Sequence, residues 1–265
     1  MDGQHIHPTA VVDPGTELGP GVEIGPYCVV GAGVRLGAGC RLQSHVVLSG
    51  PATVGAENVF YPFACVGGRS QDLKYTDEPT HLIIGDRNTF REFTTVHRAT
   101  APGGTTRVGS GGNFLSYSHI AHDCLVGDEV IFSNNGTLAG HVEVGDRAVV
   151  GGLTAVHQFC RIGRLAITGG CSKIVQDVPP FMMVDGNPAC VRHINQIGLE
   201  RAGHSKETVR ALREAYRVLY RSDLNTAQAL ERLRAEFGEV PEVAGLVEFV
   251  AGSKRGIVGR RQKAL

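Results

Sequence analysis

Residues 108–179 read VGSGGN-FLSYSH-IAHDCL-VGDEVI-FSNNGT-LAGHVE-VGDRAV-VGGLTA-VHQFCR-IGRLAI-TGGCSK-IVQDVP. In nearly every hexad the first residue is aliphatic or Phe, and a small or β-branched residue stands four positions later. A period of six fits neither an α-helix nor simple strand alternation, and a fixed period indicates a repeat architecture. The pattern predicts a β-solenoid. Each hexad should form one short strand and a turn, with three hexads closing one coil around a narrow core.

The same period begins at Ile6 and continues in one phase to Val66. It is interrupted over residues 67–82 and 97–107 and keeps its phase across both interruptions. We expect each interruption to be a loop that bulges from a coil, with the stack of about nine to ten coils continuing beyond it. Loops on a rigid scaffold commonly carry function. The first loop is the stronger candidate because of its polar and aromatic residues, Gln71, Asp72, Lys74 and Tyr75.

The composition narrows the class of function. Lys and Arg total 26 and Asp and Glu total 26, so the net charge favours neither nucleic acid nor an anionic membrane as a partner. No apolar stretch approaches the roughly 18 residues that span a bilayer. The start, MDGQHIHPTA, lacks the layout of a signal peptide. We therefore expect a cytoplasmic protein without an integral membrane segment.

The cysteines indicate core packing and not cross-linking. Four of the seven stand in the fifth position of their hexads, where a small apolar side chain is needed: Cys28, Cys40, Cys124 and Cys160. Buried Cys behaves as a small hydrophobe. The count is odd and no CxxC spacing occurs. We expect reduced thiols, no bound metal and no other cofactor.

After residue 180 the pattern changes from hexads to helices. Ser205 is suited to cap a helix whose apolar residues recur every three or four positions. Further helices are expected over residues 226–237 and after Pro241, which suits a first helical turn. The chain should thus divide into a β-solenoid domain, residues 1–187, and a helical domain, residues 188–265, with a frayed basic end. The first of these helices carries a basic stripe of Arg210, Arg213, Arg217 and Arg221.

Residues three hexads apart should stack directly on one another in successive coils. This places His122, Gly140 and Gln158 in one column, with Asp123 and His141 in the next. His157 falls in the column on the other side. The sequence therefore predicts one surface patch of three histidines beside a carboxylate and a glycine backbone.

Such a patch is suited to acyl transfer. An unperturbed imidazole has a pKa near 6.5 and is mostly the free base at cytosolic pH. It can take a proton from an alcohol while that alcohol attacks a thioester. Gly140 has no side chain, so its N–H can approach a developing oxyanion, a contact typically worth about 3 kcal/mol. Asp123 could orient the base, but spacing alone does not name the reaction.

Several segments resemble the UDP-N-acetylglucosamine O-acyltransferase family. They are QDLKY at residues 71–75, SHIAHDC at 118–124, LAGHV at 138–142 and AVHQF at 155–159. The resemblance covers nearly the whole chain and implies a left-handed parallel β-helix with a small C-terminal helical domain, assembled as a homotrimer. It also implies transfer of an (R)-3-hydroxyacyl group from acyl carrier protein to the 3-hydroxyl of UDP-N-acetylglucosamine, the first step of lipid A biosynthesis.

The resemblance also implies roles for single residues. By motif, His122 matches the general base, with Asp123 beside it, and Gly140 matches the oxyanion donor. Gly170 matches the position that limits the length of the acyl chain. The positions that match substrate contacts are Asp72, Lys74, His119, His141, His157 and Gln158 in the solenoid, and Asn195 and Arg201 at the nucleotide.

Three positions in the helical segment depart from the family pattern. Pro188 stands where a polar residue is common, Ile197 where a Glu is expected, and Ala202 where a second Arg often follows. The acceptor therefore stays open between the usual sugar and its 3-amino analogue, which would make the chain an N-acyltransferase.

Two alternatives come from other classes. One is a γ-type zinc carbonic anhydrase, because trimeric left-handed β-helices of that class bind zinc through histidines at a subunit interface. The ligands would then be His97, His119 and His122. The other is a purely structural solenoid, which leaves the histidine patch unexplained.

Overall fold

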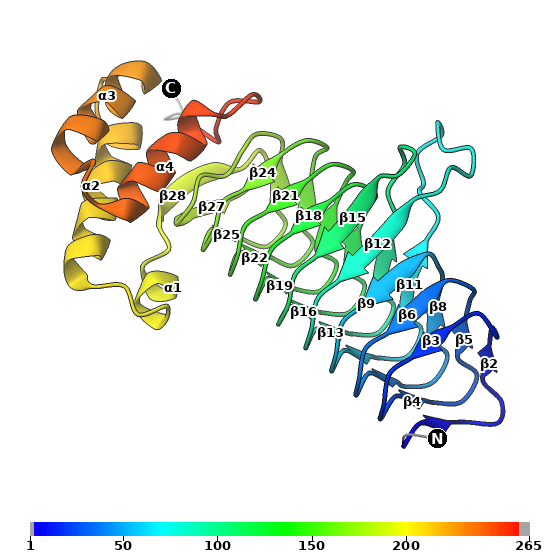
Figure 1. Cartoon of the computed structure of the whole chain (residues 1–265). Helices are drawn as coiled ribbons and strands as arrows, with labels where there is room; N and C mark the ends of the chain where they lie inside the picture. Colours follow the sequence, from blue (N-terminus) through cyan, green and yellow to red (C-terminus); the bar gives the residue numbers. More distant parts are fainter. Residues whose placement is uncertain (1–2, 260–265) are drawn as a thin grey trace.

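The hexads close into triangular coils because each short strand pairs in parallel with the strand three hexads away. His119–Ile120 pairs with Thr137–Leu138, and that strand pairs in turn with Ala155–Val156. The computed structural model, which describes residues 3–259, is a parallel β-helix with three flat sheets, and a group of helices covers its C-terminal end (Figure 1). The β-solenoid prediction is confirmed. The sheets contain 11, 9 and 8 strands within the described residues, which agrees with the expected number of coils.

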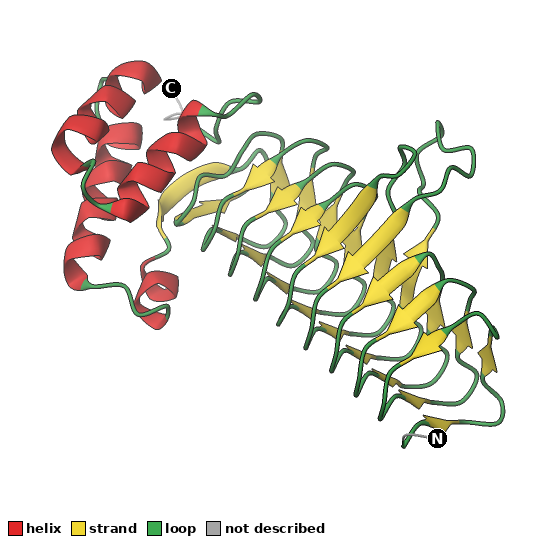
Figure 2. Ribbon diagram, in the orientation of Figure 1, coloured by secondary structure: helices red, strands yellow, loops and turns green. Residues whose placement is uncertain are grey.

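We call the sheets A, B and C in the order in which the chain visits them (Figure 2). Sheet A contains β1 (His5–Ile6), β4 (Glu23–Ile24), β7 (Arg41–Leu42), β10 (Val59–Phe60), β13 (Thr89–Phe90), β16 (Asn113–Phe114), β19 (Ile131–Phe132), β22 (Val149–Val150), β25 (Ile167–Thr168), β27 (Met182–Asp185) and β28 (Cys190–Ile194). Sheet B contains β2 (Val11–Val12), β5 (Val29–Val30), β8 (Val47–Leu48), β11 (Cys65–Gly68), β14 (Thr95–His97), β17 (His119–Ile120), β20 (Thr137–Leu138), β23 (Ala155–Val156) and β26 (Lys173–Ile174). Sheet C contains β3 (Glu17–Leu18), β6 (Val34–Leu36), β9 (Ala52–Val54), β12 (His81–Ile84), β15 (Thr105–Val108), β18 (Leu125–Val126), β21 (Glu143–Val144) and β24 (Arg161–Ile162). The prism therefore has three corners, which we call A–B, B–C and C–A.

The core has the composition that the hexad positions predict. Four phenylalanines from the first position, Phe60, Phe90, Phe114 and Phe132, are fully buried and lie in successive coils of sheet A. The first three stack ring on ring at centroid distances of 5.0 and 4.9 Å. The four cysteines of the fifth position are buried and unpaired, as expected. Burial raises the pKa of the Cys124 thiol to about 12, so it stays protonated and inert.

The corners use a left-handed backbone conformation. Asp123, His141 and Phe159, in the fourth position of equivalent hexads in successive coils, have φ values of 59°, 60° and 64°. Each of these conformations costs about 1–2 kcal/mol in an L-residue. Hydrogen bonds between coils offset part of that cost: the His141 N–H donates to the His122 carbonyl at 3.0 Å, and the Phe159 N–H to the Gly140 carbonyl at 3.3 Å. Among the described non-glycine residues with positive φ, none is β-branched, as sterics require.

Both interruptions of the hexad pattern are loops at corner B–C, and the stack continues beyond them as expected. The first loop covers residues 69–80 and the second covers residues 98–104. Strand β12 still pairs with β9 on one side and with β15 on the other. The two loops contact each other, because the Gly103 N–H donates to the Pro79 carbonyl at 2.8 Å and the Ser70 and Thr100 hydroxyls lie 2.6 Å apart. In Figure 1 they project in cyan from the side of the prism.

The helical domain consists of α1 (Gln196–Arg201), α2 (Lys206–Arg221), α3 (Thr226–Phe237) and α4 (Pro241–Ala251). The three helices expected from sequence are present: Ser205 caps α2, α3 has the predicted bounds, and Pro241 starts α4. The hairpin of β27 and β28 and the short helix α1 follow no period and were not expected. The proposed domain boundary at residues 187/188 falls in the turn of that hairpin.

A buried ion pair fastens the helical domain to the last coil. The Asp177 side chain is 2% exposed and accepts from the Arg161 Nε at 3.0 Å and from the Ser253 hydroxyl at 2.8 Å. The Arg161 guanidinium lies 4.2 Å over the Phe249 ring of α4 and donates to the Phe249 carbonyl. Removing one partner of such a pair typically costs about 3–5 kcal/mol, so the contact holds the two parts together.

Residues 254–259 return to the β-helix after α4. The Val258 N–H donates to the Asp177 carbonyl at 2.8 Å, and Val258 is buried. The expectation of a frayed basic end is therefore wrong for residues 254–259, while residues 260–265 lie outside the described residues. A helix with the length and apolarity needed to cross a membrane does not occur between residues 3 and 259.

Candidate active site

The two loops and the predicted catalytic residues lie at corner B–C. Downstream of the loops, successive coils place His122 and Asp123, then Gly140 and His141, then Gln158 and Phe159 at this corner, as the stacking argument predicted. A cavity of 560 Å³ lies between the first loop and this column. Its lining includes Asp72, Lys74, His119, His122, Gly140 and Gln158.

His122 and Asp123 form a hydrogen-bonded pair at the base of the cavity. The His122 Nδ1 lies 2.8 Å from the Asp123 Oδ2, and the imidazole side chain is 6% exposed. An ionised carboxylate only accepts hydrogen bonds, so the proton of the neutral imidazole sits on Nδ1. The Nε2 atom is therefore left with a free lone pair, which is the form that a general base needs.

The second loop holds the Asp123 carboxylate in place. The Thr100 N–H donates to the Asp123 Oδ2 at 3.1 Å, and the Asp123 N–H donates to the Thr106 hydroxyl at 2.8 Å. Thr100 and Thr106 could not be recognised from the sequence, because the hexad pattern is absent from this stretch. The second loop, which the sequence made the weaker candidate, therefore positions the His122–Asp123 pair.

Gly140 is required by the packing of His122. A Cβ atom at position 140 would lie 2.5 Å from the His122 Nε2, which is too close for any real contact. The absence of a side chain lets the imidazole lie against the backbone of the next coil. Among the hydrogen bonds of residues 3–259, none has the Gly140 N–H as donor. That N–H is therefore free to bind a ligand in the cavity.

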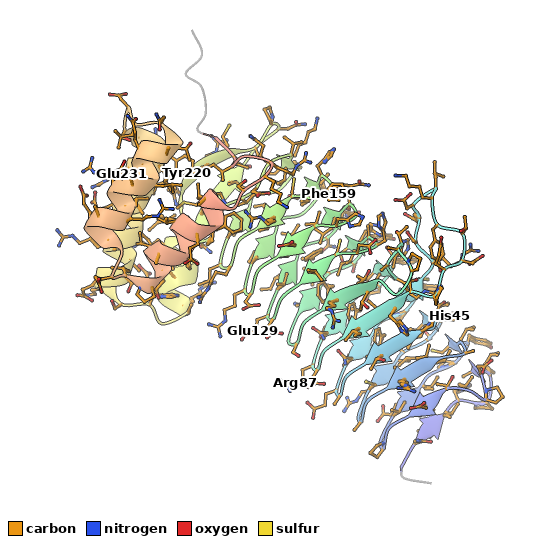
Figure 3. All side chains as sticks on the ribbon, turned by 45° about the horizontal axis from the view of Figure 1, so that its top comes forward. His45, Arg87, Glu129, Phe159, Tyr220 and Glu231 are labelled. Carbon is orange, nitrogen blue, oxygen red and sulfur yellow. The ribbon has the colours of Figure 1, made fainter. Side chains whose placement is uncertain are left out.

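His141 lies between the His122–Asp123 pair and the next coil. Its ring meets His122 edge-on at 5.2 Å and stacks on Phe159 at 4.7 Å. Its Nε2 is 3.7 Å from the Asp123 Oδ2. Figure 3 shows Phe159 along the upper edge of the prism, with Arg87 and Glu129 of corner C–A along the lower edge.

Two further imidazoles on the side of the loops are held neutral. The Nδ1 of His119 lies 2.7 Å from the Thr95 hydroxyl, and burial, with His122 nearby, lowers the pKa of His119. His97 meets the His119 ring edge-on at 5.0 Å. Burial, reinforced by His119 and His122, lowers the pKa of His97 to about 4. His97 was considered from sequence only as a zinc ligand.

The first loop carries Asp72 and Lys74 to the open side of the cavity. The Asp72 Oδ1 accepts from the Lys74 N–H at 2.9 Å, which fixes a tight turn at the tip. Between them Leu73 is fully exposed although it lines the cavity. An ordered loop that presents an apolar side chain to solvent is suited to contact a substrate or another chain.

The other predicted site residues lie apart from the cavity in this chain. His157 is exposed, and its Nδ1 contacts the Gln158 carbonyl at 3.0 Å. Gly170 lies at corner A–B, stacked on Gly152. Asn195 lies at corner C–A, where its amide donates to the Leu165 carbonyl and accepts from the Gly198 N–H. Arg201 ends α1 and is exposed.

Within one chain, the zinc ligands of the carbonic anhydrase alternative do not converge on one metal site. Within residues 3–259, the histidine, cysteine and carboxylate atoms close enough to share one ion belong to His122, Asp123 and His141. His97 and His119 are outside that group.

Comparisons with known proteins agree with this geometry. Residues 177–258 match the model described as Udp N-acetylglucosamine O-acyltransferase, Domain 2, and residues 5–38 match the bacterial transferase hexapeptide model. An acyl-[acyl-carrier-protein]–UDP-N-acetylglucosamine O-acyltransferase of Verminephrobacter eiseniae is 51% identical over 96% of this chain and 99% of its own length. The crystal structure of UDP-N-acetylglucosamine O-acyltransferase from Moraxella catarrhalis is 42% identical, with a TM-score of 0.91 over 96% of this chain and 99% of that one. The Francisella novicida enzyme has a TM-score of 0.94 at 34% identity, covering 97% and 95%.

The stacked hexads and the histidine–aspartate pair at their corner define a hexapeptide-repeat acyltransferase with a left-handed parallel β-helix. The sequence identity of about half to the curated relatives, over nearly the full length, then identifies one family within that class. The chain belongs to the UDP-N-acetylglucosamine O-acyltransferase family.

The lowered pKa of His97 predicts a pH dependence of stability. The unfolded chain binds a proton at His97 below about pH 6.5, whereas the folded chain does so only near pH 4. The free energy of unfolding should therefore fall as the pH drops through this window, by up to about 3 kcal/mol from this group. In His97→Gln the fall should be smaller by that amount, as measured by urea unfolding between pH 7 and pH 4. His81→Gln, at an exposed position, is the matched control. Equal pH slopes for His97→Gln and wild type would contradict the assignment.

Proposed function

We propose that this chain transfers an (R)-3-hydroxyacyl group from acyl carrier protein to the 3-hydroxyl of UDP-N-acetylglucosamine, with His122 as the general base. The observation that carries the proposal is the His122–Asp123 pair, 2.8 Å apart, facing a cavity that Gly140, Asp72 and Lys74 also line. The relatives are named O-acyltransferases, and we place this chain with them and not with the N-acyl alternative. The reaction would be the first step of lipid A biosynthesis in the cytoplasm, with no cofactor required.

The mechanism follows from the tautomer of His122. Its Nε2 takes the proton of the sugar 3-hydroxyl as that oxygen attacks the thioester carbon. The carbonyl oxygen becomes an oxyanion, and the free N–H of Gly140 stabilises it. The Asp123 carboxylate stabilises the imidazolium that forms, in the way that a buried aspartate supports histidine in other acyl transfers. When the intermediate collapses, the C–S bond breaks and the imidazolium returns its proton to the leaving thiolate.

Replacing the base should remove most of the activity without unfolding the chain. We expect His122→Ala to lower kcat by at least about 100-fold, the usual contribution of a general base. His81→Ala, at an exposed histidine of sheet C, should keep normal turnover. Circular dichroism checks the fold, and the product is quantified by mass spectrometry. A folded His122→Ala variant with near-normal turnover would rule out the assignment.

We also propose that the chain acts as a homotrimer, because the substrate site implied by the family motifs is incomplete in one chain. His122, Gly170 and Asn195 lie at three different corners of the prism. Corner A–B carries a column of stacked aromatic side chains that are 42–59% exposed, an apolar strip of the kind that marks an interface. The strip consists of Tyr27, Phe63, Phe93 and Tyr117, with His45 stacked between the first two.

A shared site predicts complementation between inactive variants. His122→Ala and Arg201→Glu should each be inactive alone. If Arg201 reaches the His122 of a neighbouring copy, refolding the two together restores intact sites, up to about a quarter of the wild-type number in random trimers. Activity of the refolded mixture checks this. Mixed trimers that stay inactive, when each variant is inactive alone, would show that each chain uses its own Arg201.

Gly170 should limit the length of the acyl chain by lying in the groove between two copies. A Cβ at this position meets only the Gly152 carbonyl oxygen at 3.4 Å, so a larger side chain fits the fold and projects outward. Gly170→Met should therefore shift selectivity toward shorter acyl donors in a competition between long and short chains. Gly245→Met, in open space on α4, should leave it unchanged. An unaltered preference in Gly170→Met would contradict the role.

The acyl carrier protein is expected to dock on α2, since carrier proteins are acidic and this helix carries an exposed basic stripe. Arg210, Arg213 and Arg217 are exposed, although Arg217 pairs with Glu214 and Arg213 donates to Gln196 at 2.8 Å. The net charge of the chain is zero, so the stripe is a local excess that can steer an acidic partner.

Charge reversal on this stripe should affect one substrate and not the other. We expect Arg213→Glu with Arg217→Glu to raise the KM for acyl carrier protein and to leave the KM for the UDP-sugar nearly unchanged. The wild-type KM for the carrier should rise with salt, because the Debye length falls from about 10 Å at 0.1 M. Arg232→Glu with Arg234→Glu on α3 is the control. Equal effects on both substrates would argue against docking here.

A further inference from the structure

The His122–Asp123–His141 triad has the ligand chemistry of a transition-metal site. The Asp123 Oδ2 lies 2.8 Å from the His122 Nδ1 and 3.7 Å from the His141 Nε2, and the three ligand atoms all lie within 4.8 Å of one another. Ligands about 2.0–2.1 Å from a tetrahedral Zn²⁺ stand about 3.3 Å apart. The two separations from Asp123 bracket that value, and the third, between the two imidazoles, is at most 4.8 Å, so a movement of the part-exposed His141 side chain would bring the three ligands around one ion.

The surroundings of the triad are suited to holding such an ion. The carboxylate is held from outside by the Thr100 N–H at 3.1 Å, which fixes the oxygen that would face the metal. The His141 side chain is 38% exposed, so the triad is open on that side. Two imidazoles and one carboxylate suit Zn²⁺ and Co²⁺, whereas Mg²⁺ prefers an all-oxygen shell.

We propose that Zn²⁺ binds to the His122 Nδ1, the Asp123 Oδ2 and the His141 Nε2 and switches the enzyme off. Neutral His122 carries its single proton on Nδ1, where Asp123 accepts it. A metal on Nδ1 displaces that proton to Nε2, so no proton leaves the imidazole overall. The Nε2 then carries a hydrogen atom and can no longer accept one from the sugar hydroxyl. The inhibition, though not the binding, rests on the proposed role of His122 as the base.

The binding is tested with Co²⁺, whose visible absorption reports tetrahedral nitrogen and oxygen ligation without any substrate. We expect one Co²⁺ per chain in the wild type, displaced by Zn²⁺ and unaffected by millimolar Mg²⁺. His141→Ala should weaken the Co²⁺ affinity by at least about tenfold, since a direct ligand contributes no less than an outer-shell partner. His81→Ala, which removes an exposed histidine elsewhere, should bind like the wild type.

Turnover is then measured on the same samples during a Zn²⁺ titration. Inhibition that follows the metal occupancy, and that EDTA reverses, supports the proposal in full. Absence of the Co²⁺ band, or equal affinity in His141→Ala and wild type, overturns the site. Binding at the triad with undiminished turnover overturns the switch and also contradicts His122 as the base, while the metal site itself stands.

Discussion

The Asp123 carboxylate is the group on which the rest of the site depends. One of its oxygens, Oδ2, accepts the Nδ1–H of His122 and the N–H of Thr100 and lies near His141. The first contact sets the tautomer of the base, and the second attaches the loop of residues 98–104 to the prism. Asp123 achieves this from a left-handed backbone conformation, φ 59°, which costs about 1–2 kcal/mol. The hydrogen bond from its own N–H to Thr106 helps to hold that conformation.

The two histidines nearest the loops, His97 and His119, are neutral in the resting site. Burial lowers the pKa of both His97 and His119, and each imidazole disfavours a positive charge on its neighbours. A proton that arrives from the substrate therefore goes to the imidazole with a carboxylate partner, which is His122. The cluster of histidines thus favours one proton acceptor over the others, although all of them have the same side chain.

The hexad period predicted much of the fold and part of the site. It placed His122 against Gly140, and it assigned Cys124 and its equivalents to the core, because parallel coils of constant length turn sequence separation into spatial contact. It could not reveal the contact of Thr100 with Asp123, since a loop outside the repeat has no fixed register. The hairpin of β27 and β28 and the helix α1 were missed for the same reason. The corner residues also carried little signal, because residues as different as Asp, His and Phe adopt the positive φ at this corner.

Asn195 and Gly170 lie away from His122 within one chain. Both match family positions by motif, yet one chain places them at corners away from His122. Asn195 also uses its amide to cap α1 and to hold the Leu165 carbonyl, so its fold role is established while its nucleotide contact stays a prediction. In the homotrimer proposed above, the packing of copies would bring these residues to the His122 of a neighbouring chain.

Asp123 holds His122 in the tautomer that leaves Nε2 free. The most direct measurement is ¹⁵N NMR of the imidazole in protein labelled at histidine, with His122→Gln used to assign its signals. We expect that at pH 7.5 the His122 Nδ1 bears the proton and Nε2 does not, and that Asp123→Asn removes this preference. A proton on Nε2 in the resting wild-type enzyme, or a doubly protonated imidazolium, would contradict it.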